Sequence, residues 1–408
     1  MRDVIVVGAR VAGSALALRL ARRGLDVLLV DRSHFPSDTL STHQMQVAGV
    51  ARLAGLGVLD RLLAAGTPPT RRILFHAGRA VVDAPVPTVD GVDFMISPRR
   101  TLLDGVLLDA ARDAGAEVCE GTSVEALLRE GARVTGAHLL DRRTGREHDE
   151  RARLVVGADG RRSTVARLVE ARGYDGRRAA TVASYTYWAD FPADAGEVHG
   201  GDGWAAAVWP TNDGLTMTYV ARPIGEFDVV RRDPEAALLE VLDRAGTLGK
   251  RAREARRSGP VRSTDDTGAT FREPGGPGWL LAGDAGLVID PITGLGMSHA
   301  LRDAELADQA VAGLLGGSER RALRDYRKAR DGQTRTIYGF TAGLAALRGT
   351  GPAEERLFEA IGSDPDVGTR FFAAISGAEP VERFFSPPNL VRLVGVRGFL
   401  ALARSRPR

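Results

Sequence analysis

The sequence has a single cysteine, Cys119, among its 408 residues. One cysteine cannot form an internal disulfide, and no cluster of cysteine and histidine has the spacing of metal ligands. The composition therefore argues against a disulfide scaffold and against metal dependence. It fits a reducing compartment, and we expect the protein in the cytoplasm.

Long apolar runs and an excess of one charge are also missing. The first apolar run, Val4 to Val7, is too short for a signal segment, and no stretch reaches the about 18 apolar residues of a membrane span. We expect no stable membrane insertion. Lysine plus arginine number 55 against 52 acidic residues, which leaves a net charge of +3 and no basic block that would favour nucleic acid.

Residues 3 to 31 predict a βαβ unit: an apolar strand, a turn with Gly8 and Gly13, a helix rich in Ala and Leu, and a second strand that ends at Asp31. The turn differs from G-x-G-x-x-G because Arg10 takes the middle position. An acid at Asp31 suits ribose hydroxyls and disfavours a 2′-phosphate. A plain α/β unit without a ligand is the alternative. The expected dinucleotide contacts are Gly8, Arg10, Val11, Ala12, Gly13, Asp31 and Arg32.

Two later segments also place an acid after an apolar strand, in RLVVGADGRRSTV and in WLLAGDAGLVIDPITGLGM. Acids at the carboxyl ends of parallel strands face the ligand crevice. In the second segment, glycines free the backbone just before a helix whose first N–H groups lack partners, which suits an anionic ring edge. The expected contacts are Asp159, Gly160, Gly283, Asp284, Pro291, Gly294, Leu295, Gly296 and Met297.

Taken in this order, GARVAG, the ADG segment and GDAGLVIDPITGLGM resemble the class A flavoprotein monooxygenases, with the fold of para-hydroxybenzoate hydroxylase, and the related geranylgeranyl reductases. The resemblance spans roughly residues 3 to 345. It implies bound FAD, with the first motif on ADP, the second shared with a visiting nicotinamide, and the third on the ribityl chain. It also implies a contact from Arg100, which precedes Leu103 and Asp104, and either a pyrophosphate contact or plain surface exposure for Arg10.

The chain departs from this pattern at two further positions. Ala166 stands where the second motif usually has Arg, and Ser298 replaces a common Asn. These departures affect nicotinamide docking and side-chain contacts to the flavin ring, while the role of the backbone is unchanged.

The expected fold class is α/β, with a discontinuous Rossmann-type FAD domain of the GR2 type, an inserted antiparallel substrate sheet and C-terminal helices. Between the cofactor segments lie short runs rich in β-branched and aromatic residues, which predict the antiparallel sheet. A helix is expected over residues 319 to 347. The predicted domains are residues 1–69, 98–173 and 273–345 for FAD, 70–97 and 174–272 for the substrate sheet, and 346–408 for a helical cap.

In the resembling family, such a sheet covers the flavin and carries the substrate. Its side chains here are candidates for the substrate lining, and the alternative is that each merely belongs to the core between sheet and helices. The candidates are Tyr185, Tyr187, Trp209, Pro210, Met217 and Tyr219.

The stretch from Leu40 to Gln44 falls where the chain of the family passes the flavin ring. His43 is the only titratable side chain in that stretch, and it is our candidate for an acid, a base or a substrate-orienting group, against the alternative of a hydrogen-bonded loop histidine. Only one dinucleotide fingerprint is present, so NADPH or NADH must visit transiently.

The resemblance implies that reduced flavin reacts with O₂ to a C4a-hydroperoxide, which hydroxylates or epoxidises a hydrophobic small molecule, here from bacterial secondary metabolism. The only lysines, Lys250 and Lys328, are misplaced for a flavin-dependent halogenase. A reductase of an isoprenoid or other C=C bond is the second hypothesis, although GWAAAVWP only faintly matches Y-x-W-x-F-P. The third is a flavoprotein that binds a ligand or partner without catalysis.

Overall fold

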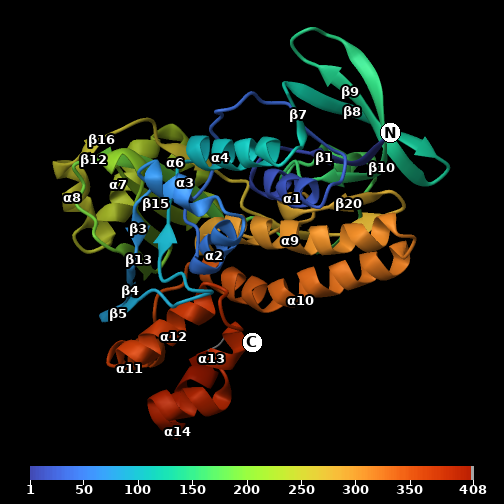
Figure 1. The fold of residues 1–408 in the computed structure, drawn as a ribbon. Helices are drawn as coiled ribbons and strands as arrows, with labels where there is room; N and C mark the ends of the chain where they lie inside the picture. The colour runs from blue at the N-terminus through green and yellow to red at the C-terminus, as the bar shows by residue number, and fades with distance from the viewer. Residues whose placement is uncertain (406–408) are drawn as a thin grey trace.

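The computed structural model describes residues 1–405 and is built around two large sheets (Figure 1). The strand order of the first sheet is β19-β20-β10-β1-β2-β7, with β8 and β9 attached through β10. All neighbours from β20 to β7 run parallel, as expected for strands joined by helical crossovers. The bounds are β1 (Arg2–Val7), β2 (Val27–Asp31), β7 (Glu117–Glu120), β8 (Thr122–Glu130), β9 (Arg133–Asp141), β10 (Glu147–Gly157), β19 (Gly275–Gly276) and β20 (Trp279–Leu281).

Three strands from distant parts of the chain have their C-terminal ends at the same level in this sheet. Val7 of β1 pairs with Gly157 of β10, and Gly157 pairs with Leu281 of β20. The glycine turn, the ADG segment and the GD segment therefore begin side by side at one edge. This arrangement confirms the predicted fold class, in which separated segments build one Rossmann-type sheet.

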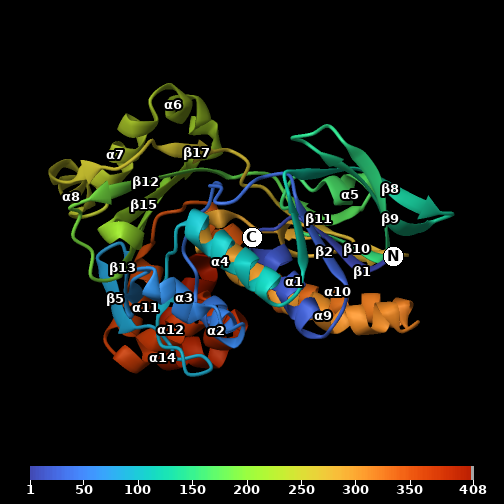
Figure 2. The same ribbon diagram turned by 45° about the horizontal axis from the view of Figure 1, so that its top comes forward.

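The first sheet is covered on both faces because its central strands are apolar throughout. Val4 and Val6 face a helical layer, and Ile5 and Val7 face the β8–β9 hairpin. In the helical layer α1 packs against α4 and α9, and α10 packs against α9 (Figure 2). The bounds are α1 (Val11–Arg22), α4 (Arg100–Asp113), α5 (Thr164–Leu168), α9 (Gly296–Leu315) and α10 (Glu319–Ala345).

The second sheet has the strand order β16-β12-β15-β14-β13-β4-β5, with β17 paired to β12. Its pairs are antiparallel except one: β4 and β13 run parallel, so the prediction of a wholly antiparallel sheet is wrong at this pair. The pair joins two segments that lie more than 100 residues apart in the sequence, so no tight turn forces them to run antiparallel. The bounds are β4 (Arg72–Ala77), β5 (Ala80–Pro85), β12 (Thr181–Ala189), β13 (Gly196–Gly201), β14 (Trp204–Pro210), β15 (Thr216–Pro223), β16 (Arg256–Arg257) and β17 (Arg262–Thr264).

The two faces of the second sheet pack against different partners. Trp188, Val208 and Val220 pack against two helices that sequence patterns did not assign, α7 (Pro234–Arg244) and α8 (Leu248–Glu254). Val182 packs against a third, α6 (Phe227–Arg232). The opposite face carries alternating large side chains and belongs to the main core. Its members are Tyr185, Tyr187, Trp209, Met217 and Tyr219, and we call it the tyrosine face.

Smaller elements complete the molecule. The C-terminal helices are α11 (Pro352–Gly362), α12 (Pro365–Ile375), α13 (Val381–Phe384) and α14 (Pro387–Ser405), and residues 406–408 of the predicted cap lie outside the described residues. The helices α2 (Val47–Gly55) and α3 (Leu59–Ala64) follow β2. The remaining pieces are the pair β3 (Pro69–Thr70) with β6 (Met95–Ile96), the sheet of β11 (Gly173–Arg177), β18 (Ala269–Arg272) and β21 (Leu287–Val288), and 3-10 turns η1 (Asn212–Gly214), η2 (Ile224–Glu226), η3 (Gly283–Ala285) and η4 (Pro291–Thr293).

Across residues 1–405, none of the helices combines the length and the apolar character needed to cross a bilayer.

Candidate functional site

The first turn after β1 accepts only glycine at two positions. Gly8 has φ of 100°, and a Cβ there would lie 2.6 Å from the carbonyl oxygen of Ala158. A Cβ on Gly13 would lie 1.7 Å from the carbonyl oxygen of Gly8. The backbone of this turn therefore lies directly against the ADG segment, and no side chain caps the first N–H groups of α1, which a ligand group could use.

Asp31 is buried at the end of β2 and holds the same turn. Its two oxygens accept hydrogen bonds from the backbone N–H groups of Ala9, at 2.7 Å, and Ser33, at 2.8 Å. Each carboxylate oxygen keeps a second lone pair that a ribose hydroxyl can use. Arg32, also predicted at the site, is exposed.

Two arginines from different elements share one buried carboxylate. Asp104 on α4 has no exposed surface and accepts from Arg10 at 2.6 Å and from Arg100 at 2.9 Å. The trio carries one net positive charge beside the glycine turn, which suits a diphosphate. Plain surface exposure was one alternative for Arg10, and its side chain is 26% exposed in the structure. The anchoring role of Asp104 was missed by the sequence analysis, which noted the residue only as part of the motif after Arg100.

The carboxylate of Asp159 is already engaged within its own loop. It accepts from the Ser163 hydroxyl and the Thr164 backbone N–H, both at 2.6 Å, and so holds the start of α5. Burial raises the pKa of this carboxyl, and these hydrogen bonds act in the opposite direction. The next residue, Gly160, adopts φ of 81°. In the structure, therefore, Asp159 shapes the loop beneath the crevice.

Asp284 behaves differently, because its carboxylate accepts no hydrogen bond from any described residue. Burial raises the pKa of its carboxyl, while Arg161 and Arg100 favour the charged form. The preceding Gly283 has φ of 58°, and a Cβ there would lie 2.8 Å from Cβ of Ala12. A carboxylate with free lone pairs thus stands beside the start of α1, ready for sugar or ribityl hydroxyls.

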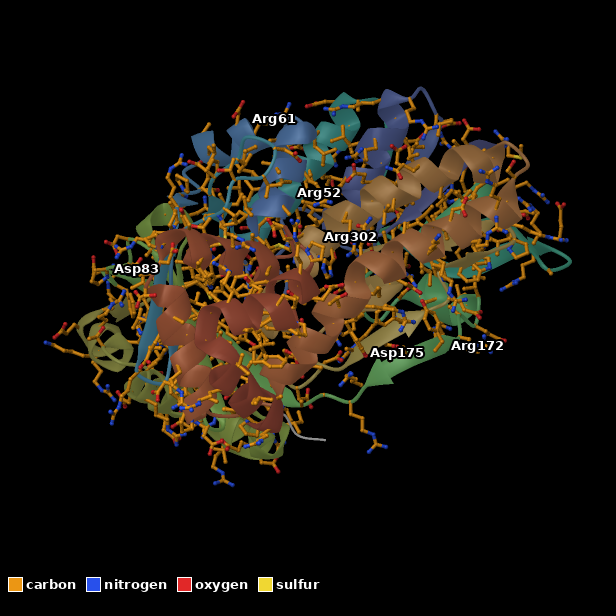
Figure 3. The ribbon with its side chains drawn as sticks, turned by 90° about the horizontal axis from the view of Figure 1, so that it is seen from below. Arg52, Arg61, Asp83, Arg172, Asp175 and Arg302 are labelled. Carbon is orange, nitrogen blue, oxygen red and sulfur yellow. The ribbon has the colours of Figure 1, made fainter. Side chains whose placement is uncertain are left out.

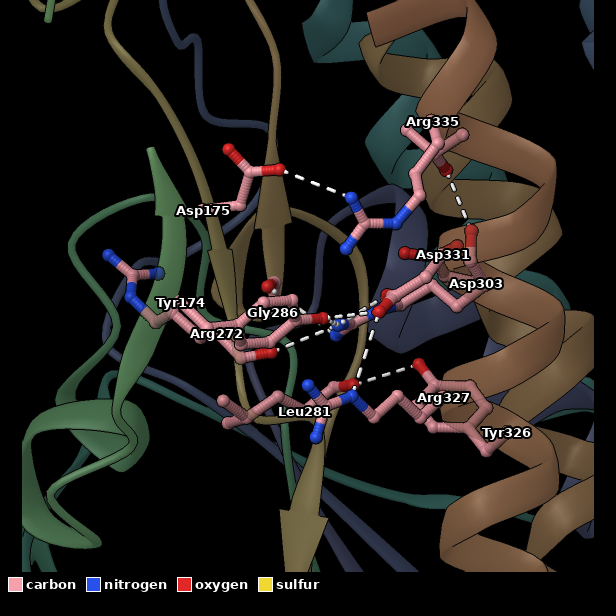
Figure 4. A network of polar contacts seen from close by, with 12 residues as sticks. Tyr174, Asp175, Arg272, Leu281, Gly286, Asp303, Tyr326, Arg327, Asp331 and Arg335 are labelled. Atoms are coloured by element: carbon pink, nitrogen blue, oxygen red, sulfur yellow. Dashed lines mark hydrogen bonds and ion pairs between the residues drawn. The ribbon is translucent and has the colours of Figure 1, made fainter. Parts of the chain in front are cut away.

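Helix α10 supports the GD segment from behind (Figure 4). The guanidinium of Arg330, which is fully buried, donates to the carbonyl oxygens of Gly286 at 3.4 Å and Arg272 at 2.9 Å. The Tyr326 hydroxyl donates to the carbonyl oxygen of Leu281 at 2.8 Å. These bonds fix both ends of the turn that carries Asp284. The sequence analysis missed Arg330, because nothing in a helix with many arginines marks the one that is buried.

The loop after that turn continues to α9 as predicted. Pro291 opens the 3-10 turn η4, Gly294 has φ of 62°, and Gly296 is the first residue of α9. Leu295 and Met297 are buried. The side chain of Gln46, just after the Leu40 to Gln44 stretch, donates to the carbonyl oxygen of Thr293.

His43 is buried and has its two ring nitrogens engaged. Nδ1 lies 2.8 Å from the carbonyl oxygen of Ser41, and Nε2 lies 2.6 Å from the hydroxyl of Tyr187. Because a carbonyl only accepts, Nδ1 carries the hydrogen, and Nε2 accepts from the tyrosine. Burial and the nearby Arg100 lower the pKa of His43 to about 4. The imidazole is therefore neutral at pH 7.

The tyrosine face brings the other predicted substrate residues next to His43. The ring of Tyr185 stands edge-on to His43 with centroids 5.3 Å apart, and Tyr219 pairs with Tyr185 across the strands. The hydroxyls of Tyr185 and Tyr219 are buried and have no hydrogen-bond partner among the described residues. Burial raises the pKa of both phenols, that of Tyr185 to about 12. Both hydroxyls can therefore donate a hydrogen bond to an acceptor on a ligand.

The other predicted substrate residues are Trp209, Met217 and Pro210. A Cβ at Gly196 would lie 1.9 Å from the ring of Trp209, so the indole is locked against that glycine. Met217 pairs with both Tyr187 and Trp209, and Pro210 is half-buried at the strand end.

A basic hollow of about 690 Å³ lies beside the ADG segment. Arg162 at its rim is exposed, whereas Arg161 and Arg272 are half-buried. Asp266 pairs with Arg161 and Arg162 and offsets part of their charge. The sequence analysis assigned no role to these side chains. The lining is Arg161, Arg162, Arg177, Asp265, Asp266, Gly268, Ala269, Thr270 and Arg272.

The arrangement fits a flavin dinucleotide. The glycine turn offers backbone N–H groups, the two arginines at Asp104 carry an uncompensated positive charge, and the Asp284 carboxylate has free lone pairs. Residues 1–337 match the model of a protein family described as FAD binding domain.

Curated relatives and solved structures are similar over long stretches. Menaquinone reductase of Mycolicibacterium smegmatis is 30% identical over 330 residues, which cover 76% of this chain and 76% of the relative. Rifampicin monooxygenase of Rhodococcus hoagii is 31% identical over 168 residues, 41% of this chain and 33% of the relative. The structure of the flavin-dependent brominase Bmp2 superposes with a TM-score of 0.81 at 20% identity and covers 99% of this chain and 100% of its own.

Proposed function

The chain belongs to the family of FAD-binding domains and is an FAD-dependent oxidoreductase, and we propose that it reduces a double bond of an apolar, oxygen-bearing small molecule. The observation that carries this proposal is the pair of unpartnered hydroxyls, Tyr185 and Tyr219, on the tyrosine face. Buried donors without a partner suit a ligand that brings acceptor oxygens into an otherwise apolar pocket.

The ionisation of the site supports reduction. Adding two electrons to a double bond requires a hydride and a proton, so the site needs a hydroxyl donor. The low pKa of His43 and the raised pKa of Tyr185 and Tyr219 keep all three groups neutral at pH 7. The tyrosine face therefore offers hydroxyl donors, whereas the His43 imidazole is a weak base for activating a phenol, because its pKa is lowered and its Nε2 already accepts from Tyr187.

Each residue then has a definite task. FAD, once bound and reduced by NADPH or NADH, would supply the hydride. Tyr185 and Tyr219 donate hydrogen bonds to the substrate oxygen, and one of them would give that oxygen the proton that accompanies the hydride and regain a proton from solvent. Tyr187 gives its hydrogen to His43, so its oxygen keeps lone pairs that can accept a hydrogen bond. The sheet itself keeps water from the reacting bond, because the tyrosine face is buried in the main core.

The similarity to menaquinone reductase supports the same reaction class, since it extends over three quarters of both chains. A quinone has the chemistry that the face requires, with apolar rings and two acceptor oxygens. We therefore propose an isoprenoid quinone or a related isoprenoid as the substrate class.

The reductant in this proposal is NADPH or NADH, which visits the basic hollow. Arg162 in the loop between β10 and α5 and Arg177 at the end of β11 line it, and their guanidinium groups suit the diphosphate of a nicotinamide dinucleotide.

Oxygenation is the second candidate, and the similarity to rifampicin monooxygenase favours it. The tyrosine face would then lie against an electron-rich small molecule that receives oxygen, as expected from the sequence.

One experiment separates the candidates. The FAD-loaded protein is incubated with NADPH, ¹⁸O₂ and a naphthoquinone that carries an unsaturated isoprenoid chain. The proposal expects a product two hydrogens heavier and without label. Labelled oxygen in the product would instead establish oxygenation. If NADPH bleaches neither the flavin nor the substrate band, the catalytic proposal fails and a binding module remains.

A further inference from the structure

Two histidines and a glutamate meet on the helix-covered face of the second sheet. His76 of β4 pairs with His199 of β13, and Glu197 precedes His199 by two residues on the same face. One ligand atom from each of the three lies within 4.8 Å of the others. The sequence analysis found no metal-ligand spacing, because these residues come from two strands that are far apart in the chain.

Nε2 of His199 lacks a hydrogen-bond partner in this cluster. Its side chain is 7% exposed, and Nε2 accepts or donates no hydrogen bond among the described residues. The nearest carboxylate oxygen, Oε2 of Glu197, is 3.6 Å away, which is too far for a hydrogen bond. The other oxygen of Glu197 is held by Arg251 of α8 at 2.7 Å. A buried ring nitrogen and a free carboxylate oxygen thus face one another with a gap between them.

We propose that His76, Glu197 and His199 bind a divalent transition cation of the Zn²⁺ class, with water in the remaining position. Two imidazoles and one carboxylate form a donor set that suits zinc, and zinc bonds of about 2.0 to 2.2 Å would close the gap between the ligand atoms. Arg251 serves as the outer partner that orients the carboxylate.

Binding requires a specific movement. The rings of His76 and His199 are stacked, with centroids 4.0 Å apart and planes inclined by 6°. A cation must lie in the plane of each imidazole, and parallel planes do not meet. His199 is buried and fixed, whereas His76 is half-buried, so the His76 ring turns toward the cation.

The cation would act as a structural clamp. It lies on the face of the second sheet opposite the tyrosine face. Glu197 and His199 pair with Val208 and Ala206, and these two residues pack against α7 and α8. It joins β4 of the earlier inserted block to β13 of the later one. This role is independent of the proposed reduction.

The test is calorimetric titration of ZnCl₂ into the FAD-loaded protein after removal of metals by a chelator. The wild type should bind one equivalent, and His199→Ala and His76→Ala should each weaken binding at least about tenfold. His138→Ala is the matched control, since the partly exposed His138 of β9 also lies beside two carboxylates, Glu147 and Asp149 of β10. It should bind zinc as the wild type does.

Thermal unfolding provides a second measurement in case an alanine variant folds poorly. Zinc should raise the Tm of the wild type and of His138→Ala, and it should leave the Tm of Glu197→Gln unchanged. The amide of glutamine can still pack beside Arg251, so this variant should keep the fold. Absence of stoichiometric binding in the wild type, or undiminished binding in His76→Ala and His199→Ala, would overturn the proposal.

Discussion

The Tyr187 hydroxyl donates a 2.6 Å hydrogen bond to Nε2 of His43, across 144 residues of sequence. The bond joins the loop after β2 to the inserted sheet, and it fixes the tautomer of the histidine. It also divides the tyrosine face into one hydroxyl that is paired within the protein and two that are not.

Replacing tyrosine by phenylalanine should therefore have opposite effects on protein stability at Tyr187 and at Tyr219. Tyr187→Phe leaves Nε2 of His43 unpaired and should destabilise the protein by about 1 to 3 kcal/mol. Tyr219→Phe removes a buried hydroxyl that has no partner and should stabilise the substrate-free protein by about 1 kcal/mol. Urea unfolding of the FAD-loaded variants measures both. Equal destabilisation by the two substitutions would show that Tyr219 already has a partner in the free protein.

Tyr219→Phe should weaken substrate binding although it stabilises the substrate-free protein. If its hydroxyl donates to the substrate, Tyr219→Phe should bind substrate about tenfold more weakly while its stability rises, because one hydrogen bond contributes about 0.5 to 1.5 kcal/mol. Tyr326→Phe is a matched control, since that hydroxyl donates to the Leu281 carbonyl. It should affect stability and flavin binding more than substrate binding.

Protonation of His43 predicts how stability depends on pH. The pKa is about 4 in the folded protein and 6.5 ordinarily, so the unfolded chain binds more protons between these values. Stability is therefore full above pH 6.5 and falls by up to about 3 kcal/mol as the pH drops to about 4.

His43→Asn tests this dependence, because asparagine accepts the φ of 58° at this position. Burial also lowers the pKa of His76 and His299, so the wild type loses stability from several groups. The difference between wild type and variant isolates His43. Urea unfolding between pH 7 and pH 4.5 should show a shallower loss in the variant, and parallel curves would contradict the assignment.

Asp284 should contribute to FAD affinity and little to folding. Because its carboxylate accepts no hydrogen bond from described residues, Asp284→Ala should weaken FAD binding by roughly 1.5 to 3 kcal/mol without lowering the stability of the flavin-free protein. Flavin fluorescence during titration measures the affinity. Asp325→Ala, an exposed carboxylate on α10, should bind FAD normally. Asp31→Ala should differ by destabilising the flavin-free protein as well, since Asp31 holds Ala9 and Ser33.

The basic hollow predicts a selective effect on the reductant. Arg162→Glu reverses an exposed charge at its rim and should raise the KM for NADPH by about tenfold while FAD content stays normal. Arg61→Glu is the control, because Arg61 is likewise an exposed arginine paired with one carboxylate, Asp113, and does not line the hollow. Figure 3 shows Arg61 at the top of the view, away from Arg172 at the lower right. If both variants raise KM equally, the hollow is not the docking site.

The sequence predicts the flavin fold well because glycines and strand-ending acids have a fixed geometric meaning. Gly8, Gly13 and Gly283 stand where any side chain would collide with a neighbouring segment, so their spacing reports the contact directly. The family resemblance supplied the aromatic candidates, and the structure places five of the six on one face, because side chains two apart in a strand share a face.

Other features depend on partners that the sequence does not show. Asp104 and Arg330 resemble many other charged helix residues until the fold buries them. The parallel pairing of β4 with β13 joins two inserted blocks, and no local pattern predicts it. For the same reason, His76 and His199 become neighbours only in the folded protein.

The placement of β1, β10 and β20 side by side has a consequence for synthesis on the ribosome. Val7 emerges first, and Leu281 is added only after more than half of the chain has been made. At about 5 to 20 residues per second, the interval is roughly 15 to 55 s. Throughout it, the apolar strands of the nucleotide unit lack their last neighbour and the turn of Asp284, so the nascent chain can retain FAD only late in translation.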